Sequence, residues 1–229
     1  MASKILNIEL KDVPLFRGLT SSERALVETA LRVKPFEKGE FLFTEGSSCE
    51  RIFIVKSGRV KVFRTASSGR EQILEILEPG QTCACNPGSS SWACVTNSQA
   101  MTACEVWFLP RDNYIKLVNS NSSMMHALNK LFADRLCHFS SLIADVSLNE
   151  VKKRLIKFLL DMSDEDQESS KKDEVLSINF TREEIAQRIG TARETIVRHL
   201  YQLKESKLID IKPRQIIIRN REGLHKLLR

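Results

Sequence analysis

The segment at residues 181–203, TREEIAQRIGTARETIVRHLYQL, constrains the fold more than any other part of the chain. Thr181 followed by Glu184 has the spacing of a capping box, which marks the first turn of a helix. Gly190 separates two runs of apolar residues that recur every three or four positions. These residues are Ile185 and Ile189 before the glycine, and Ile196, Leu200 and Leu203 after it. Two short amphipathic helices joined at a glycine predict a helix-turn-helix.

Two short apolar runs follow this motif. They are Leu208–Ile211 and Gln215–Ile218, and the turn residues Lys212-Pro213-Arg214 separate them. Strand-forming runs joined by a short turn predict a β-hairpin. We therefore expect a winged helix-turn-helix at this end of the chain.

The outward face of the second predicted helix carries side chains that can read DNA. Arginine can bond both acceptors of guanine in the major groove, and glutamate can accept from the amino group of cytosine. A recognition helix places such side chains in its N-terminal turns. The candidate base-reading residues are Arg193, Glu194, Val197 and Arg198. We predict further DNA contacts from Thr181, Arg182, Thr191, Lys212 and Arg214.

Two structural explanations of Glu194 compete with base reading. Glu194 stands four residues before Arg198, a spacing at which opposite charges form a surface ion pair on a helix. It could instead cap its own helix, which would begin at Thr191.

The positive charge of the chain lies at the same end. Residues 180–229 carry 12 Lys and Arg against 6 Asp and Glu, whereas the remaining residues carry 23 of each sign. A basic end on a neutral body is expected where one end of a protein meets phosphate. The alternative is a solvated basic tail. Together with the motif, the charge predicts sequence-specific binding of double-stranded DNA.

The N-terminal half has the pattern of a small β-sandwich or barrel. We expect two short helices first, at Leu10–Leu19 and Ser21–Val33. Short strand-like runs punctuated by glycine then follow, as in many all-β domains. The expected strands are Glu40–Phe43, Arg51–Val55, Arg59–Arg64, Gln72–Leu77 and Thr102–Leu109.

The apolar period changes after Pro110. Apolar residues now step by three and four, which predicts one long amphipathic helix. They are Met125, Leu128, Phe132, Leu136, Phe139, Ile143 and Val146. This stripe could pack on the β domain, and its spacing also suits pairing with a second copy of the helix, which we favour. A further helix is expected at Val151–Met162, and then a polar surface loop at Ser163–Glu174.

The cysteines are the second unusual feature of the sequence. No apolar run approaches the length of a membrane span, and Met1–Glu9 lacks the apolar core of a signal peptide, so we expect a cytoplasmic protein. Structural disulfides are rare in that compartment. Four of the six cysteines nevertheless lie within 22 residues: Cys83, Cys85, Cys94 and Cys104.

Thiols in such a cluster suit a soft metal, an iron–sulfur cluster or a reversible disulfide. We predict Cys83, Cys85 and Cys94 as the sensing or metal-binding residues, with Cys104 a weaker candidate ligand because it stands inside an apolar strand. We interpret Cys49 and Cys137 as structural. Since a free cysteine also packs as a small apolar residue, packing is the alternative for the whole group.

The sequence resembles the catabolite activator/FNR (Crp/Fnr) superfamily of bacterial transcriptional regulators. The similarity is carried by GTARETIVRHL in the helix-turn-helix and by the glycine punctuation of the β region at Gly39, Gly46, Gly58 and Pro79-Gly80. It implies an α+β fold with a cyclic-nucleotide-binding-like β-roll at residues 1–120, a dimerisation helix at 121–147 and a winged helix-turn-helix at 148–229. It also implies a homodimer that works with RNA polymerase. The arrangement Arg193-Glu194-Arg198 resembles the subgroup that reads a palindrome with TGTGA-like half-sites.

The resemblance also bears on the effector. Members that bind cyclic AMP hold it with a glutamate after the Pro-Gly turn and with an Arg-Ser pair, whereas this chain has Gln81, Cys94 and Val95 at those positions. Losing the arginine removes the main anchor of a buried phosphate, so we do not expect cyclic AMP as effector. A cysteine-rich sensor pocket is expected in its place, with metal or iron–sulfur binding ranked first and thiol–disulfide switching second.

Two family analogies limit the choice of cofactor. Members with an oxygen-labile cluster draw their cysteines from an N-terminal extension, and this chain has none before Cys49. A haem-containing carbon monoxide sensor carries a C-x-H pair near this loop, whereas this chain has C-x-C, so Cys83 could be an axial ligand but Cys85 replaces the histidine poorly. Haem therefore ranks third, and a constitutive regulator without ligand is the other alternative.

The distribution of the histidines argues against an enzyme. The four histidines are scattered along the chain and none stands beside the cysteine segment, so the sequence offers no nucleophile–base pair. A thiol oxidoreductase built on the C-x-C pair is the enzyme rival, and we expect a regulator.

Overall fold

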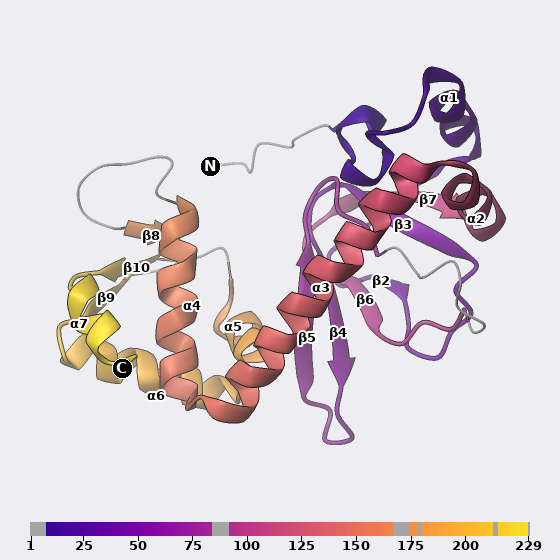
Figure 1. Cartoon of the computed structure of the whole chain (residues 1–229). Coiled ribbons are helices and arrows are strands. Elements are labelled where there is room, and N and C mark those ends of the chain that lie inside the picture. Colours follow the sequence, from indigo (N-terminus) through magenta and orange to yellow (C-terminus); the bar gives the residue numbers. More distant parts are fainter. Residues whose placement is uncertain (1–7, 84–91, 167–174, 178–179, 213–214, 229) are drawn as a thin grey trace. The chain divides into compact units, whose positions relative to one another are not determined.

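The computed structural model describes residues 8–83, 92–166, 175–177, 180–212 and 215–228 (Figure 1). The chain divides into two compact units. The first comprises residues 1–64 and 73–139, and the second comprises residues 65–72 and 140–229.

The first unit begins with helical turns. Two short 3-10 helices, η1 (Leu10–Asp12) and η2 (Pro14–Phe16), stand where one longer helix was predicted. Pro14 separates them because its nitrogen has no hydrogen to donate to a continuing helix. The helix α1 (Ser21–Ala30) begins at a capping box, in which Thr20 and Glu23 each bond the other's backbone.

The helix predicted as far as Val33 ends at Ala30, and a strand takes over. This strand, β1 (Arg32–Phe36), pairs along its whole length with β7 (Cys104–Pro110). Pro35 explains the change, since the residue before a proline avoids the helical region and prefers extended backbone.

The strands of the first unit form two antiparallel sheets. One has the order β1-β7-β3 and the other β2-β6-β4-β5. Their bounds are β2 Phe41–Phe43, β3 Arg51–Ser57, β4 Val60–Thr65, β5 Glu71–Leu77, β6 Asn97–Ala100 and β7 Cys104–Pro110. The predicted strands are confirmed within a few residues, whereas β1 and β6 had not been predicted. Because β1 and β7 lie far apart in sequence, no local pattern indicated their pairing.

Aromatic side chains fill the interior between these strands. Phe53 is fully buried and its ring lies 5.8 Å from that of Phe43 and 6.4 Å from that of Phe108. Val55, Val60, Leu77 and Val106 complete the same cluster. The strands therefore enclose a packed interior of the chain's own side chains.

Two helices follow the strands. The helix α2 (Arg111–Ser120) had not been predicted, and α3 (Ser122–Leu148) is the long helix expected from the apolar stripe. A second apolar cluster joins η1, η2, α1 and α2 to the first turns of α3. Its fully buried members include Phe16, Tyr114, Met124 and Leu128.

The second unit is built mainly of helices. Its elements are α4 (Val151–Asp166), β8 (Val175–Ser177), α5 (Arg182–Ile189), α6 (Arg193–Glu205), β9 (Ile209–Lys212), β10 (Gln215–Ile218) and α7 (Arg221–Lys226). The predicted polar loop at Ser163–Glu174 begins later than expected, because α4 continues to Asp166. The three strands form a sheet in the order β8-β10-β9, of which only the β9–β10 hairpin was predicted. The core joins α4 to α5, α6 and α7 through Leu155, Ile156 and Leu159.

Candidate DNA interface and sensor site

The helix-turn-helix has the predicted capping box, turn and buried residues. The Thr181 hydroxyl accepts the N–H of Glu184 at 3.1 Å, and the Glu184 carboxylate accepts the N–H of Thr181 at 2.7 Å. Gly190 ends α5 with φ 80° and ψ 47°, a left-handed conformation that glycine adopts without a side-chain clash. The predicted inward residues are all buried: Ile185, Ile189, Ile196, Leu200 and Leu203. The turn therefore holds the outer face of α6 away from the core.

The outer face of α6 carries the predicted base-reading side chains. Arg193, Glu194 and Arg198 are exposed, and Val197 is half-buried. Among the described residues, no ion pair joins Glu194 to Arg198. The helix begins after Ala192, and no side chain caps it. Neither structural explanation of Glu194 is therefore found, and these polar groups face solvent.

The remaining predicted DNA contacts lie at several places in the second unit. Thr181 is exposed, and Lys212 is exposed at the end of β9. Thr191 is half-buried and donates its N–H to Ala186 at 3.0 Å. Arg182 is half-buried, and this burial lowers its pKa from the ordinary value. The predicted contact Arg214 lies outside the described residues.

An acidic residue that sequence reasoning missed connects α6 to the wing. The Asp210 carboxylate lies 3.8 Å from the Lys204 ammonium and 3.6 Å from the Arg219 guanidinium. It also accepts the N–H of Ile211 at 2.8 Å. This hydrogen bond and the two cations lower the pKa of Asp210. Asp210 therefore stays ionised at neutral pH, where it holds the end of α6 beside β9 and β10.

Cys83, a predicted sensor residue, and Cys104, the weaker candidate metal ligand, both belong to the aromatic cluster of the first unit, where Cys83 is half-buried and Cys104 is buried. Cys83 packs against the aromatic cluster, its N–H bonds Phe53 at 3.2 Å, and burial raises the pKa of its thiol. Cys104 is buried at the start of β7, and burial raises its pKa to about 11. Both thiols are therefore neutral at pH 7. Cys85 lies outside the described residues.

The third predicted sensor cysteine lies beside a residue that had been interpreted as structural. Cys94 donates its N–H to Ser47 at 2.9 Å, and Cys49 donates its N–H to Trp92 at 2.6 Å. Ser48 and Ala93 form the bridge between these two antiparallel segments. The Cys94 thiol hydrogen-bonds to that of Cys49, and this bond, followed by burial, raises the pKa of Cys94. No sequence signal indicated this contact, because the two cysteines come from distant segments.

The described cysteines do not by themselves fit a metal site. Within residues 8–83, 92–166 and the other described segments, no group of three or more His, Cys, Asp or Glu side chains is arranged to hold a metal ion. A structural zinc or an iron–sulfur cluster requires such a donor set.

The helix α3 is tied to the first unit next to Cys83. The Arg135 Nε–H donates to the two oxygens of Glu75 at 3.2 and 3.1 Å, and another guanidinium N–H donates to the Thr82 carbonyl. Three residues further, the His138 ring bonds the Leu74 carbonyl at 2.9 Å. The guanidinium is close enough to Cys83 to act on its pKa, although burial outweighs this effect. The hydrogen bonds that join α3 to Glu75 and Thr82 therefore lie near Cys83.

The predicted dimer residues do not all lie on one surface. Leu128 is only 1% exposed within the chain's own core, so its predicted place at a dimer interface is corrected. Met125 and Phe132 are half-buried against the same core. By contrast, Leu136 is 72% and Ile143 is 65% exposed, and half-buried Phe139 lies between them in sequence.

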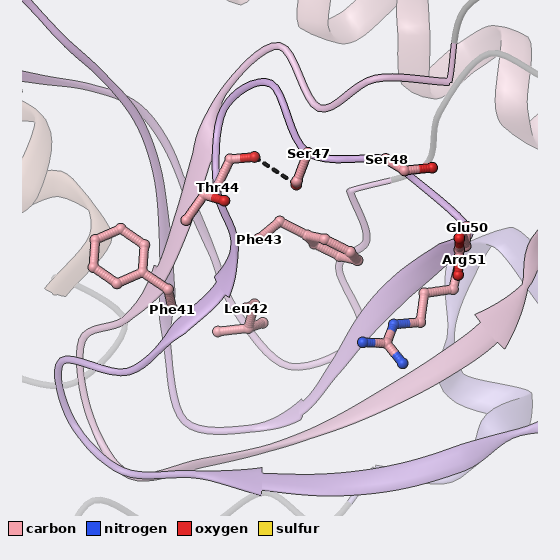
Figure 2. A pocket seen from close by; sticks show the side chains of 8 residues that line it. All are labelled: Phe41, Leu42, Phe43, Thr44, Ser47, Ser48, Glu50 and Arg51. Carbon is pink, nitrogen blue, oxygen red and sulfur yellow. Dashed lines mark hydrogen bonds between the residues drawn. The ribbon is translucent and has the colours of Figure 1, made fainter.

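A pocket of about 410 Å³ lies beside the Cys49 and Cys94 segments (Figure 2). It is lined by Phe41, Leu42, Phe43, Thr44, Ser47, Ser48, Glu50 and Arg51. The Ser47 hydroxyl donates to the Thr44 carbonyl at 2.6 Å, and the side chain of Ser47 also hydrogen-bonds to the Cys94 thiol. The Arg51 guanidinium packs over the Phe108 ring at 4.5 Å. Ser47 therefore connects the pocket to the thiol pair.

Two domain families match the chain. The cyclic nucleotide-binding domain family matches residues 33–121, and the Crp-like helix-turn-helix domain family matches residues 153–227. A CRP-like cAMP-activated global transcriptional regulator of Mycobacterium tuberculosis is 27% identical over 221 residues, which cover 94% of this chain and 96% of the relative. The cyclic AMP receptor protein of Thermus thermophilus is 26% identical over 222 residues, covering 95% and 98%.

The fold is also that of a solved structure. A variant of CooA from Carboxydothermus hydrogenoformans matches 99% of this chain and 98% of that protein with a TM-score of 0.79, at 21% identity. In the described part of the chain, no helix has the length and apolar character needed to cross a membrane. With a cyclic nucleotide-binding domain followed by a Crp-like helix-turn-helix, the chain belongs to the Crp/Fnr family of DNA-binding transcriptional regulators, a non-enzymatic family.

Proposed function

We propose that the chain binds a palindromic, TGTGA-like operator as a homodimer and controls transcription together with RNA polymerase. The observation that carries this proposal is the outer face of α6, where Arg193, Glu194 and Arg198 are exposed. Arginine and glutamate at the start of a recognition helix suit guanine and cytosine edges. In this proposal residues 1–120 are the sensor, 121–147 the dimerisation helix and 148–229 the DNA-binding domain.

The proposed dimer forms through α3. Phe132, Leu136, Phe139, Ile143 and Val146 step by four and three residues, which is the spacing of a seam between two helices. Leu136 and Ile143 would otherwise expose large apolar side chains to water. A pair of such chains places its two recognition helices about 34–36 Å apart, one turn of DNA.

The proposed control acts through the cysteine segment. Cyclic AMP is not the effector in this proposal, because Cys94 and Val95 stand where the family's cyclic AMP-binding members have Arg and Ser, and Val95 is 72% exposed. Cys83 lies beside Arg135, through which α3 is bonded to β5. Thiol redox chemistry is favoured over metal binding, since the Cys94 thiol hydrogen-bonds to that of Cys49.

Base reading is tested by comparing two DNAs. Arg193→Ala should weaken binding of the matched operator by about 1–3 kcal/mol and relax the preference at one guanine. Lys212→Ala in the wing should weaken binding to all sequences and flatten the salt dependence. Lys38→Ala, which removes an exposed charge from the first unit, is the control. If Arg193→Ala weakened operator and random DNA equally, Arg193 would be only a phosphate contact.

Dimerisation is tested on residues that one chain leaves exposed. Leu136→Asp combined with Ile143→Asp should give folded monomers that no longer bind the operator tightly. Sedimentation measures the mass, and circular dichroism checks that the fold is retained. Leu26→Asp is the matched control, because Leu26 is 65% exposed on α1. A doubly substituted protein that remained a dimer would place the interface elsewhere.

The effector is tested on protein purified without air. A visible absorption spectrum with metal analysis separates haem, an iron–sulfur cluster, a colourless metal and bare thiols. We expect bare thiols and no heat of binding on titration with cyclic AMP. Operator affinity of Cys83→Ser, Cys85→Ser and Cys94→Ser is then measured with and without oxidant. If all three respond like the parent protein, the cysteine segment only packs and the regulator is constitutive.

A further inference from the structure

We propose that Cys49 and Cys94 form a reversible disulfide, so that the reacting pair includes a cysteine outside the C-x-C segment. This inference deepens the proposed control by thiols and rests on it only for its effect on DNA binding. The bond itself can be tested separately.

The backbone brings the two thiols together. The Ser48–Ala93 bridge aligns two antiparallel segments, and the flanking hydrogen bonds run from Cys49 to Trp92 and from Cys94 to Ser47. Because side chains alternate along extended backbone, Cys49 and Cys94 both point to the face opposite the bridging pair. They are diagonal neighbours across the Ser48–Ala93 bridge, and their thiols hydrogen-bond to each other.

Closing the bond requires a small movement. Diagonal neighbours across antiparallel strands typically lie roughly 7–8 Å apart, whereas the Cα atoms of a disulfide lie about 4.4–6.8 Å apart. Forming the disulfide is therefore expected to bring the segments at residues 47–49 and 93–94 closer together. Oxidation thus changes the backbone next to Trp92, whose ring packs under Arg111 at 4.4 Å and beside Tyr114.

An oxidant can reach the pair from one side. Cys49 is only 3% exposed, but Cys94 is half-buried. Ser47 lines the adjoining pocket and hydrogen-bonds to the Cys94 thiol, so a small molecule in the pocket lies next to this sulfur. The pocket also offers the Thr44 and Ser48 hydroxyls, which suit a polar oxidant such as a hydroperoxide (Figure 2).

The chemistry balances with a hydroperoxide as the oxidant. The Cys94 thiolate attacks one peroxide oxygen, so that an S–O bond forms, the O–O bond breaks, and water or an alcohol leaves. The Cys49 sulfur then attacks the Cys94 sulfur, so that the S–S bond forms and the hydroxyl leaves as water with the thiol proton. Two electrons pass from the two thiols to the peroxide. A dithiol reductant returns both cysteines to thiols by exchange.

The reaction is expected to be slow. The bond to Cys49, followed by burial, raises the pKa of Cys94, so that little thiolate is present at neutral pH. Since the thiolate is the nucleophile, the disulfide is expected to form during sustained exposure to oxidant and hardly at all during a brief one.

The test is a peptide map of the full-length protein after exposure to hydrogen peroxide. Trypsin releases residues 39–51, which contain Cys49 alone among the cysteines, and chymotrypsin cleaves after Trp92 to separate Cys83 and Cys85 from Cys94. We expect Cys49 and Cys94 cross-linked as the main disulfide, reversed by dithiothreitol. It should be absent from Cys49→Ser and Cys94→Ser and unchanged in the control Cys137→Ser. A parent protein that cross-links Cys94 to Cys83 or Cys85, or forms no disulfide, overturns the proposal without relying on any variant.

Operator affinity, measured on the same samples, separates this inference from the proposed function. If the Cys49–Cys94 bond forms and operator affinity stays constant, the disulfide is established and thiol control of DNA binding is wrong. If affinity responds to oxidant while the bond does not form, thiol control is supported and this pair is wrong. A change of operator affinity of about tenfold, lost in both serine variants, supports both, and it corresponds to about 1.4 kcal/mol.

Discussion

Both units begin a helix with the same threonine cap, yet they bury that helix in different ways. Thr20 caps α1, of which only Val27 is buried, whereas Thr181 caps α5, which buries Ile185, Ala186 and Ile189. In the second unit, α5 and α6 follow each other in the chain and pack together through Ile185, Ile189 and Ile196. In the first unit, stability comes from strands that are distant in sequence, such as β1 and β7. The strands of the first unit therefore depend on contacts between distant segments, whereas the helix-turn-helix of the second unit depends mainly on local ones.

The largest effect that would test this contrast is expected at Arg135. Arg135→Ala removes a guanidinium that is only 15% exposed and leaves Glu75 without its partner. Hydrogen bonds to charged groups contribute about 1.5–3 kcal/mol each, so urea unfolding of this variant should show a loss of at least this order. Lys56→Ala, which removes a more exposed ion pair with Glu105, should cost less than about 1 kcal/mol. Equal losses would mean that α3 gains nothing from its tie to β5.

The next effect concerns the turn between α5 and α6. Gly190→Ala forces a side chain into the left-handed region at φ 80°, which should cost about 1–2 kcal/mol. Gly39→Ala has a similar φ of 91° with open space around it, and so is the matched control in the first unit. Both variants should lose similar stability, but only Gly190→Ala should reduce operator affinity, as fluorescence anisotropy would measure. If both variants lost operator affinity equally, the turn at Gly190 would have no specific role in DNA binding.

A smaller effect is expected from the two caps themselves. Thr20→Ala and Thr181→Ala each remove a hydroxyl that accepts a helix N–H, at 3.3 and 3.1 Å. Each should cost about 1 kcal/mol in thermal unfolding. Operator binding should weaken only for Thr181→Ala. If Thr20→Ala also weakened operator binding, the effect of a cap on DNA binding would not be confined to the second unit.

The last comparison does not alter stability and concerns the rates at which exposed and buried thiols are alkylated. Cys137 is exposed on α3, whereas Cys104 is 5% exposed with its pKa raised to about 11. Iodoacetamide should therefore modify Cys137 at least about tenfold faster than Cys104. Mass spectrometry over time gives the order of modification. Fast labelling of Cys104 would mean that the interior of the first unit opens readily.

The same contrast decides what the sequence could reveal. In the second unit, the cap at Thr181, the turn at Gly190 and the outward face of α6 all follow from spacings of three and four residues. They were predicted correctly, because local periodicity determines them. Asp210 was missed, since its partners Lys204 and Arg219 come together only when the hairpin packs beside α6.

In the first unit, the individual strands were mostly predicted but their partners were not. The strand preference of a segment does not indicate which distant segment it pairs with. Without its partner β7, the start of β1 was therefore predicted as the end of a helix. The contact between Cys49 and Cys94 was missed for the same reason. The clustering of cysteines drew attention to one segment, whereas the partner of Cys94 stands in another.

The strand β1 has a consequence for how copies of this chain can meet. It is the edge of its sheet, and along it Arg32, Lys34 and Pro35 are exposed. A proline has no N–H to offer a further strand, and cationic side chains repel a second copy of the same edge. This edge of the sheet therefore resists the addition of a further strand, which disfavours aggregation through β1. The proposed dimer therefore relies on side chains of α3, which charged substitutions can disrupt without disturbing the hydrogen bonds of a sheet.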